Sequence, residues 1–413
     1  MSDALDKGYL QVNVFGESVG MPIANANVRI TEQNTGKTIE ELKTNAVGQT
    51  QAIELPAPPV ENSLETNQPK PYSQYSVFVE ADGFEAIAIE GVQVLPTQQA
   101  VQNVDLTYKT QLEPDPQNIS IEDHTLWGLF PAKIPESEVK PLPVAEGFVV
   151  LDEPVIPEFV VVHLGVPDDK SAANVYVPFK DYIKNVASCE IYSTWPNQTL
   201  RANITAIISL TLNRVYTEWY RAKGYGFTIT SSTAYDQCFS YGRNIYREIS
   251  EVVDEIFAVY ITRPNIRQPL FAQYCDGDRV VCETGMQQWG SKYLGDAGYS
   301  AISILRNYYG YDVFYKSADK VEGIPVSYKG EVLTTGSSGN AVRTIQEQLN
   351  AISDNYPLIA KIRVDGIYGE QTQNAVRTFQ KIFGLSQTGS VDYSTWYQIS
   401  NVYVAVKKLA ELK

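Results

Sequence analysis

Apolar and polar positions alternate with a strand-like period of two in the first part of the chain. Up to residue 107, short runs such as "YLQVNVFG" and "YSVFVEADGFE" are separated by turn sequences such as "NTGK" and "NAVGQT". Glycine in these turns supplies the positive φ that tight turns often need. The pattern predicts a small antiparallel β-sandwich over residues 1–107.

Proline dominates the next segment, residues 108–159, in stretches such as "FPAKIPESEVKPLPVAEG". Repeated proline prevents a regular helix or a central strand, so we expect a long connector. Its apolar patch, Gly147 to Val155, is compatible with an extended segment that lies on a neighbour, with a protease-accessible site, or with a plain packed linker.

The third part, residues 160–325, mixes strand and helix patterns and predicts a mixed α/β domain. Two helices are expected within Asp181 to Tyr216. Pro196 suits the first turn of the second helix, with Thr194 as its cap. Apolar residues at helical spacing from Leu200 onward give this helix a buried face, so we expect it to be the scaffold of the domain.

Glu190 lies on the apolar face of the first of these helices. The stripe that begins at Ile183 and includes Ala187 leads directly to it. Loss of solvation among apolar neighbours disfavours the ionised form of a carboxyl group, so such a group can stay protonated near neutral pH and act as a general acid. The alternative is a glutamate at a helix end that bends to solvent or pairs with Lys184 or Arg201.

The last part, residues 326–413, contains two helical units that share the sequence "NAVRT", at Asn340–Thr344 and Asn374–Thr378. Apolar side chains mark one face of each helix, and the glycines of "DGIYG" make a tight turn between them. We interpret this as an internal duplication. The patterns also closely resemble the small, three-helix type of peptidoglycan-binding domain, which implies peptidoglycan as a partner.

Composition limits the classes of function. The chain has 413 residues, 44% hydrophobic and 20% charged, which is enough for two or three domains with large cores. The net charge of −15 opposes binding to nucleic acid. The first residues lack the basic and apolar regions of a secretion signal, and no apolar run is long enough to cross a bilayer, so we expect neither a signal peptide nor a membrane partner.

Cysteine and histidine are scarce. The four cysteines are too few and too widely spaced for a disulfide framework, so free thiols are the default, although Cys275 and Cys282 are close enough for a local disulfide or metal pair. The two histidines are not clustered with other ligands, which argues against a zinc enzyme. A Ser-His-Asp or Cys-His site in this chain would need His163 as its base. We instead expect His163 to be a strand residue whose ring is hydrogen-bonded locally.

Three sequences in the central part carry a family resemblance. They are "DYIKNVASCEIYSTWPNQTLRANITAIISLTLNRV", "STAYDQCFSYG" and "GMQQWGSKYLGDAGYSAISILRNYYG". In this order they resemble the stage II sporulation protein D (SpoIID) family of lytic transglycosylases. The resemblance implies a catalytic acid at Glu190 and substrate-groove amides at Gln237 and Gln288. Cys282 stands where the family usually has histidine, so the metal site of some relatives is not expected here, and neither is a cofactor.

The irregular segments of these motifs are rich in hydroxyl, amide and aromatic side chains, which suits a groove that binds sugars. The predicted substrate-binding residues are Ser232, Thr233, Tyr235, Asp236, Gln237, Tyr241, Gln287, Gln288 and Trp289. A tryptophan such as Trp289 is more often a core residue than a platform for a sugar. Asp236, beside Gln237, suggests a positioning role.

The N-terminal part resembles the carboxypeptidase-regulatory-like, transthyretin-like β-sandwich family. The order of the parts, a β-sandwich, a proline-rich linker, a catalytic domain and a peptidoglycan-binding domain, resembles the clostridial spore cortex-lytic enzymes that are made as zymogens. This resemblance implies storage in the spore, in the cortex or coat region, and removal of the N-terminal region by a subtilisin-like germination protease. We expect cleavage in the linker around Val149, Val150 and Leu151.

The number of carboxylates bears on the reaction. Glycoside hydrolases usually need two, whereas a lytic transglycosylase can work with one. No convincing second carboxylate stands out in the sequence, so we expect Glu190 to act first as acid and then as base and to release 1,6-anhydro-muramic products. The rivals are a non-catalytic spore-wall protein and a hydrolytic muramidase. The N-terminal sandwich is compatible with an inhibitor, a folding aid or a localisation module.

Overall fold

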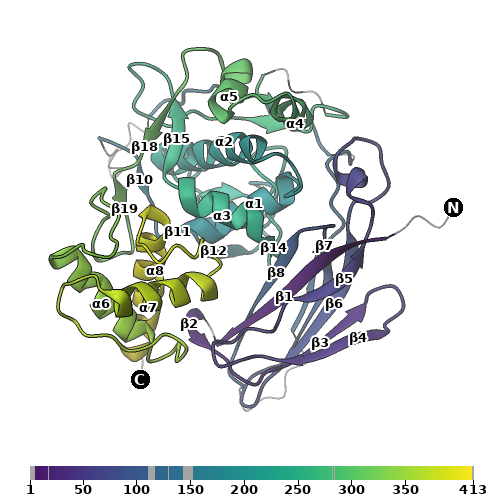
Figure 1. Cartoon of the computed structure of the whole chain (residues 1–413). Helices are drawn as coiled ribbons and strands as arrows, with labels where there is room; N and C mark the ends of the chain where they lie inside the picture. The colour runs from purple at the N-terminus through teal and green to yellow at the C-terminus, as the bar shows by residue number, and fades with distance from the viewer. Residues whose placement is uncertain are drawn as a thin grey trace.

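The computed structural model describes residues 5–411 except 17, 110–116, 129, 143–151, 281 and 283. This part of the chain has a mixed α+β fold with several sheets and eight α-helices (Figure 1). The strands of the N-terminal part lie to one side of the central helices, and the last helices contact both. The expected cleavage site at Val149, Val150 and Leu151 lies outside the described residues.

Two five-stranded sheets form most of the N-terminal part. The first sheet contains β1 (Asp6–Gly16), β2 (Ser18–Pro22), β5 (Ile53–Ala57), β8 (Gln99–Leu106) and β14 (Ile245–Tyr246). The second contains β3 (Asn27–Glu32), β4 (Thr38–Lys43), β6 (Ser73–Glu80), β7 (Ile87–Val94) and β9 (Gln117–Ser120). Residues Leu10, Val12 and Val14 of β1 are fully buried at every second position, as the predicted alternation requires.

Two strand pairs differ from the predicted antiparallel arrangement. β1 runs parallel to β8, and β7 runs parallel to β9. Parallel neighbours need a long connection, and β1 and β8 are connected through strands of both sheets. Each sheet also reaches beyond residue 107, because β9 comes from the proline-rich segment and β14 comes from the central part.

The central part is built around α2 (Asn197–Tyr216), which contacts α1, α3, α4 and α5. Its residues are buried on nearly all sides, whereas the spacing predicts one buried face. The hydroxyl groups of Thr205, Ser209 and Thr211 donate to carbonyl oxygens one turn earlier. These bonds satisfy polar groups inside the core and so allow the whole helix to be buried.

The start of α2 differs from the prediction in one respect. Pro196 immediately precedes the helix, but no side chain caps it. Thr194 instead forms a hydrogen bond of 2.8 Å with Ser63 of the N-terminal part, so the predicted cap is wrong. The hydroxyl of Thr194 therefore contributes to the contact between the two parts.

The other elements of the central part surround this helix. They are α1 (Phe179–Glu190), α3 (Arg247–Ile256), α4 (Gln288–Asp296), α5 (Ala301–Tyr309), β10 (Val155–Ile156), β11 (Phe159–His163), β12 (Asn174–Pro178), β13 (Ile229–Thr230), β15 (Val259–Thr262), β16 (Tyr274–Cys275), β17 (Met286–Gln287), β18 (Phe314–Ser317) and β19 (Lys320–Val321). Short 3₁₀ helices lie at Val60–Ser63 and Arg221–Lys223. His163 ends β11 and forms hydrogen bonds to Asn174 and Val166, which confirms its predicted local role.

The C-terminal part consists of α6 (Asn340–Ile352), α7 (Glu370–Ile382) and α8 (Tyr393–Glu411). The sequence duplication has a structural counterpart. Gln346 of α6 accepts a hydrogen bond from Gly366, and Gln380 of α7 accepts one from Gly389, both at 2.8 Å. Both glycines also have a positive φ, a conformation that glycine adopts readily. The same helix-to-turn bond is therefore made once in each repeat. No described helix is both long and apolar enough to cross a membrane.

Candidate functional site

Glu190 is the last residue of α1, and only 6% of its surface is exposed. Two N–H donors from other segments hold its carboxyl group. Cys238 donates through its backbone N–H to Oε1 at 2.7 Å, and Gln288 Nε2 donates to Oε2 at 2.9 Å. Gln288 Nε2 also donates to the backbone oxygen of Glu190 at 2.7 Å. The carboxyl group is therefore fixed in orientation.

The alternative arrangements expected for Glu190 do not occur. Lys184 pairs with Asp254 at 2.9 Å, and Arg201 pairs with Glu255. The burial of Glu190 also shows that its side chain does not bend to solvent. The Glu190 carboxyl group is therefore buried and is paired with neither Lys184 nor Arg201.

Glu190 lines a small cavity of about 30 Å³. The central part contributes Thr233, Tyr274, Cys275, Asp276, Val280 and Gln288, and the proline-rich segment contributes His124, Leu126, Phe130, Pro131 and Lys133. Such a cavity can hold about one or two water molecules. Pockets for small ligands typically measure roughly 300–1,000 Å³, so the space beside Glu190 in this structure is too small for a glycan.

Five of the residues that line the cavity belong to an extended segment. We call the described residues within 121–142 the strap; they form no helix or strand, as the prolines predict. At Leu126 the backbone N–H donates to the Tyr192 hydroxyl at 3.1 Å, and the backbone oxygen accepts from Trp289 Nε1 at 3.2 Å. The strap is thus bound to the central part directly beside the cavity.

A second attachment of the strap is ionic. Glu136 accepts hydrogen bonds from Arg214 at 2.7 and 3.0 Å and from Lys140 at 2.7 Å. Burial would raise the pKa of Glu136, but Arg214 and Lys140 hold it below its usual value. Arg214 is fully buried in α2 and also binds Asp236 at 2.6 Å. It therefore keeps one carboxylate partner if the strap leaves.

Two titratable side chains of the strap line the cavity. Lys133 Nζ donates to the backbone oxygen of Asp236 at 2.7 Å. Burial lowers the pKa of Lys133, although the charges of Glu190 and Asp236 oppose this shift. Burial, with a smaller contribution from Arg243, lowers the pKa of His124 to about 3. The docked strap therefore holds His124 in its neutral form.

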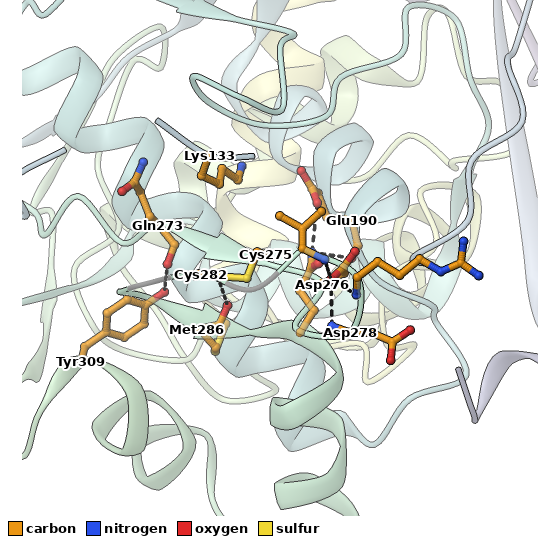
Figure 2. Close-up of a disulfide and its surroundings, with 12 residues drawn as sticks. Lys133, Glu190, Gln273, Cys275, Asp276, Asp278, Cys282, Met286 and Tyr309 are labelled. Atoms are coloured by element: carbon orange, nitrogen blue, oxygen red, sulfur yellow. Dashed lines mark hydrogen bonds between the residues drawn. A yellow bond between two sulfur atoms is a disulfide. The ribbon is translucent and has the colours of Figure 1, made fainter. Parts of the chain in front are cut away.

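A disulfide-closed loop forms another wall of the cavity (Figure 2). Cys275 and Cys282 are bonded, with 5.9 Å between their Cα atoms, so of the two arrangements that their spacing suggested, a local disulfide and a metal pair, the structure has the disulfide. Asp276 Oδ1 accepts the backbone N–H groups of residues 278–280 at 2.9 to 3.1 Å. Within the described residues, no group of three or more His, Cys, Asp or Glu side chains is placed to hold a metal ion.

Asp276 is a second carboxylate at the cavity, which the sequence pattern did not single out. The available signal was the stretch "CDGD", in which an aspartate and a glycine follow a cysteine that is close to another cysteine. That stretch predicts a turn, but its position beside Glu190 depends on contacts between distant segments.

The structure brings only some of the predicted substrate-binding residues to the cavity. Thr233 and Gln288 line it together with Glu190. Asp236 and Gln237 are fully buried in the core and do not line it. Asp236 binds Arg214, Tyr220 and Thr230, whereas Gln237 binds Tyr182 and Thr211. Their bonds hold α1, α2 and the following loop together.

The remaining predicted residues also lie outside the cavity lining. Trp289 is a core residue that packs against Trp127 and Trp195. Gln287 directly precedes α4, and Ser232 and Tyr235 are half-buried. Tyr241 is 55% exposed.

Two free cysteines flank the carboxyl group of Glu190. Cys189 precedes it in α1, and its sulfur accepts a hydrogen bond from Arg243 at 3.1 Å. Burial alone would raise the pKa of Cys189, but the Cys238 thiol and Arg243 lower it to about 7. Cys189 is thus a buried residue with a polar partner beside the site.

No curated protein matches the chain. Among solved structures, the chain is similar to the SleB N-terminal domain, with 28% identity over 19% of this chain and 99% of that one, at a TM-score of 0.17. GBS52, a minor pilin of Streptococcus agalactiae, matches with 12% identity over 27% of this chain and 49% of its own, at a TM-score of 0.19. Catechol 1,2-dioxygenase from Acinetobacter sp. ADP1 matches with 17% identity over 29% and 60%, also at 0.19.

The chain thus spans about half to three fifths of the length of the pilin and the dioxygenase. These TM-scores are too low to support an inference from any of the three structures. The C-terminal part gives the firmer result. Residues 338–399, which include α6, α7 and the start of α8, match the family described as "Putative peptidoglycan binding domain". The chain therefore contains a peptidoglycan-binding domain, which supports a role at the cell wall.

Proposed function

We propose that this chain is a spore cortex-lytic enzyme of the SleC type, a peptidoglycan lytic transglycosylase with a SpoIID-like catalytic domain. The observation that carries the proposal is the carboxyl group of Glu190. It is buried, lines a cavity, and is held by Cys238 and Gln288 in a chain that also has a peptidoglycan-binding domain. A carboxyl group in a fixed orientation at a cavity wall is suited to general acid catalysis.

In this proposal Glu190 acts twice. It gives its proton to the glycosidic oxygen between N-acetylmuramic acid and N-acetylglucosamine as the bond from that oxygen to C1 breaks. The bonding electron pair leaves with the oxygen, and positive charge develops at C1. The carboxylate then takes the proton of the muramic C6 hydroxyl as its oxygen attacks C1. The product is a 1,6-anhydro ring, no water is consumed, and Glu190 is protonated again.

We further propose that the intact chain is an inactive precursor stored in the spore. The strap supplies five lining residues of the cavity, and the remaining space of about 30 Å³ admits no sugar chain. A subtilisin-like germination protease that cuts near residues 149–151 would separate the strap from Glu190, because the strap precedes the cut and Glu190 follows it. The strap could then leave together with strands β1 to β9, which also precede the cut.

The test compares the intact full-length chain with the same chain nicked by subtilisin, each incubated with purified cortex peptidoglycan. Mass spectrometry of the products should find anhydro-muramic ends with the nicked protein and few or none with the intact one. Glu190→Gln should abolish these products, while the variant still sediments with peptidoglycan because its binding domain is unchanged.

Three outcomes would contradict the proposal in different ways. Full activity of Glu190→Gln would remove this residue from the mechanism. Reducing ends without the anhydro group would make the protein a hydrolytic muramidase. Peptidoglycan that is bound by the nicked protein but never cut would make it a wall-binding structural protein.

A further inference from the structure

Asp276 lines the Glu190 cavity, and one of its carboxylate oxygens has no hydrogen-bond partner among the described residues. Only 5% of the residue is exposed. Its Oδ1 accepts three backbone N–H groups, whereas Oδ2 is buried and accepts no hydrogen bond within the described part of the chain. A buried polar atom without a partner is destabilising, and such atoms are rare in folded proteins. This oxygen therefore requires an explanation.

The position of Asp276 is coupled to that of Glu190 through the start of α4. The backbone N–H of Trp289 donates to the backbone oxygen of Asp276 at 3.1 Å. The preceding residue, Gln288, donates from its side chain to Glu190. Two consecutive residues thus hold the two carboxylates in place, and the disulfide between Cys275 and Cys282 closes the loop that carries Asp276 (Figure 2).

We infer that Asp276 is a second substrate-contacting carboxylate of this site. Oδ2 accepts a hydrogen bond from a hydroxyl or amide N–H group of the amino sugar, and the negative charge stabilises the positive charge that develops at C1 when Glu190 gives up its proton. Asp276 forms no bond to carbon and ends the reaction ionised, so the products stay the same. The inference rests on the proposed function and adds a residue to it.

The charge of Asp276 gives the inference a pH dependence. Burial, with a smaller contribution from the neighbouring Asp278, raises the pKa of Asp276, although the three backbone N–H groups oppose this shift. The other titratable side chains at the cavity are Glu190 and Tyr274 and, on the strap, Lys133 and His124. The last two leave with the strap. Activity of the nicked enzyme should therefore fall as the pH drops through the pKa of Asp276.

The substitution Asp276→Asn tests Oδ2 separately from Oδ1. The amide oxygen of asparagine can take the place of Oδ1 and accept the three backbone N–H groups, whereas an uncharged NH₂ group replaces Oδ2. In the nicked full-length protein we expect kcat on cortex glycan to fall about ten- to hundred-fold, with KM changed less than about three-fold. The decrease of activity at acid pH that depends on Asp276 should disappear. Asp278→Asn is the matched control, since Asp278 is exposed in the same loop and does not line the cavity.

The inference is overturned if Asp276→Asn keeps kcat within two-fold of the wild type and the same pH profile. It is also overturned if the loss of activity only follows a matching loss of thermal stability, because the role would then be structural. Failure of the proposed function has a different signature. In that case Glu190→Gln stays active, or the nicked wild type releases no anhydro products.

Discussion

Gln288 and Glu190 are 98 residues apart in the sequence and are joined by two hydrogen bonds from one amide nitrogen. One bond reaches the carboxyl oxygen Oε2 and the other reaches the backbone oxygen at the end of α1. The first residue of α4 therefore determines how the proposed acid is presented to the cavity.

Replacing this donor should impair catalysis more than folding. In nicked Gln288→Leu we expect kcat to fall about ten- to hundred-fold, because a hydrogen bond to a charged group contributes about 1.5–3 kcal/mol and each 1.4 kcal/mol is about ten-fold in rate. Initial rates on cortex fragments measure this. Gln198→Leu is the control, since Gln198 bonds the backbone of Ala301 and does not line the cavity. Equal losses in both variants would assign the effect to folding.

The Glu136–Arg214 contact predicts how tightly the strap is held. Glu136→Gln removes the negative charge that Arg214 and Lys140 share, and a hydrogen bond to a charged group contributes about 1.5–3 kcal/mol. We expect the intact chain to gain at least about ten-fold in basal glycan cleavage, since 1.4 kcal/mol corresponds to about ten-fold in an equilibrium constant. The nicked enzyme should not change once the strap has left.

Asp123→Asn provides the comparison for this variant. Asp123 also belongs to the strap, but its pair with Lys70 lies at the surface, where ion pairs contribute only about 0–1 kcal/mol. Basal cleavage by intact Asp123→Asn should stay close to that of the wild type. If the strap inhibits independently of Glu136, basal glycan cleavage by both intact variants will stay at the wild-type level.

His124 makes docking of the strap sensitive to acid. Its pKa is about 3 when docked, against about 6.5 for an unperturbed histidine. Between these values the released strap binds a proton that the docked strap does not, so docking weakens as the pH falls, by about 1.4 kcal/mol per pH unit. Above about pH 6.5 His124 is neutral in both states and does not weaken docking. Below this pH docking of the strap becomes progressively weaker.

Hydrogen exchange of the intact chain measures this effect at the backbone amides of Leu126 and Ile134, which bond Tyr192 and Ala234. After correction for the intrinsic pH dependence, their protection should decrease from pH 7 to pH 5. His124→Phe should flatten the dependence. Identical slopes in the variant and the wild type would show that another group controls docking.

The features that could be predicted from the sequence depend on near neighbours. The spacing from Ile183 to Glu190 predicted a helix with a carboxylate on its buried face, because that pattern repeats within one helix. The prolines predicted the lack of regular structure in the strap. Where the strap lies could not be predicted, since it depends on contacts such as Glu136 with Arg214, 78 residues away.

The same limit applies to the sheets and to Asp276. Two residues of β14, Ile245 and Tyr246, extend the N-terminal sheet by pairing with β8, and no local pattern marks so short a strand. The loop that carries Asp276 to the cavity is held by a disulfide and by a bond to Trp289, a residue of another segment. Long-range pairing of this kind depends on the folded arrangement of the whole chain rather than on the spacing of residues.

The disulfide should support both stability and rate. Cys275 and Cys282 are seven residues apart, and closing a loop of this length contributes about 2–3 kcal/mol in the chain-entropy account. The double variant Cys275→Ser/Cys282→Ser should therefore unfold a few degrees lower, as calorimetry would show. The nicked double variant should also have a lower kcat, because the loop that holds Asp276 loses its covalent closure. A reductant without a thiol separates the loss of the disulfide from other effects of the two substitutions. Tris(carboxyethyl)phosphine should slow the nicked wild type, whose disulfide it reduces, and leave the rate of the double variant unchanged. A wild type that keeps its full rate after complete reduction of this bond would show that backbone hydrogen bonds alone position the loop.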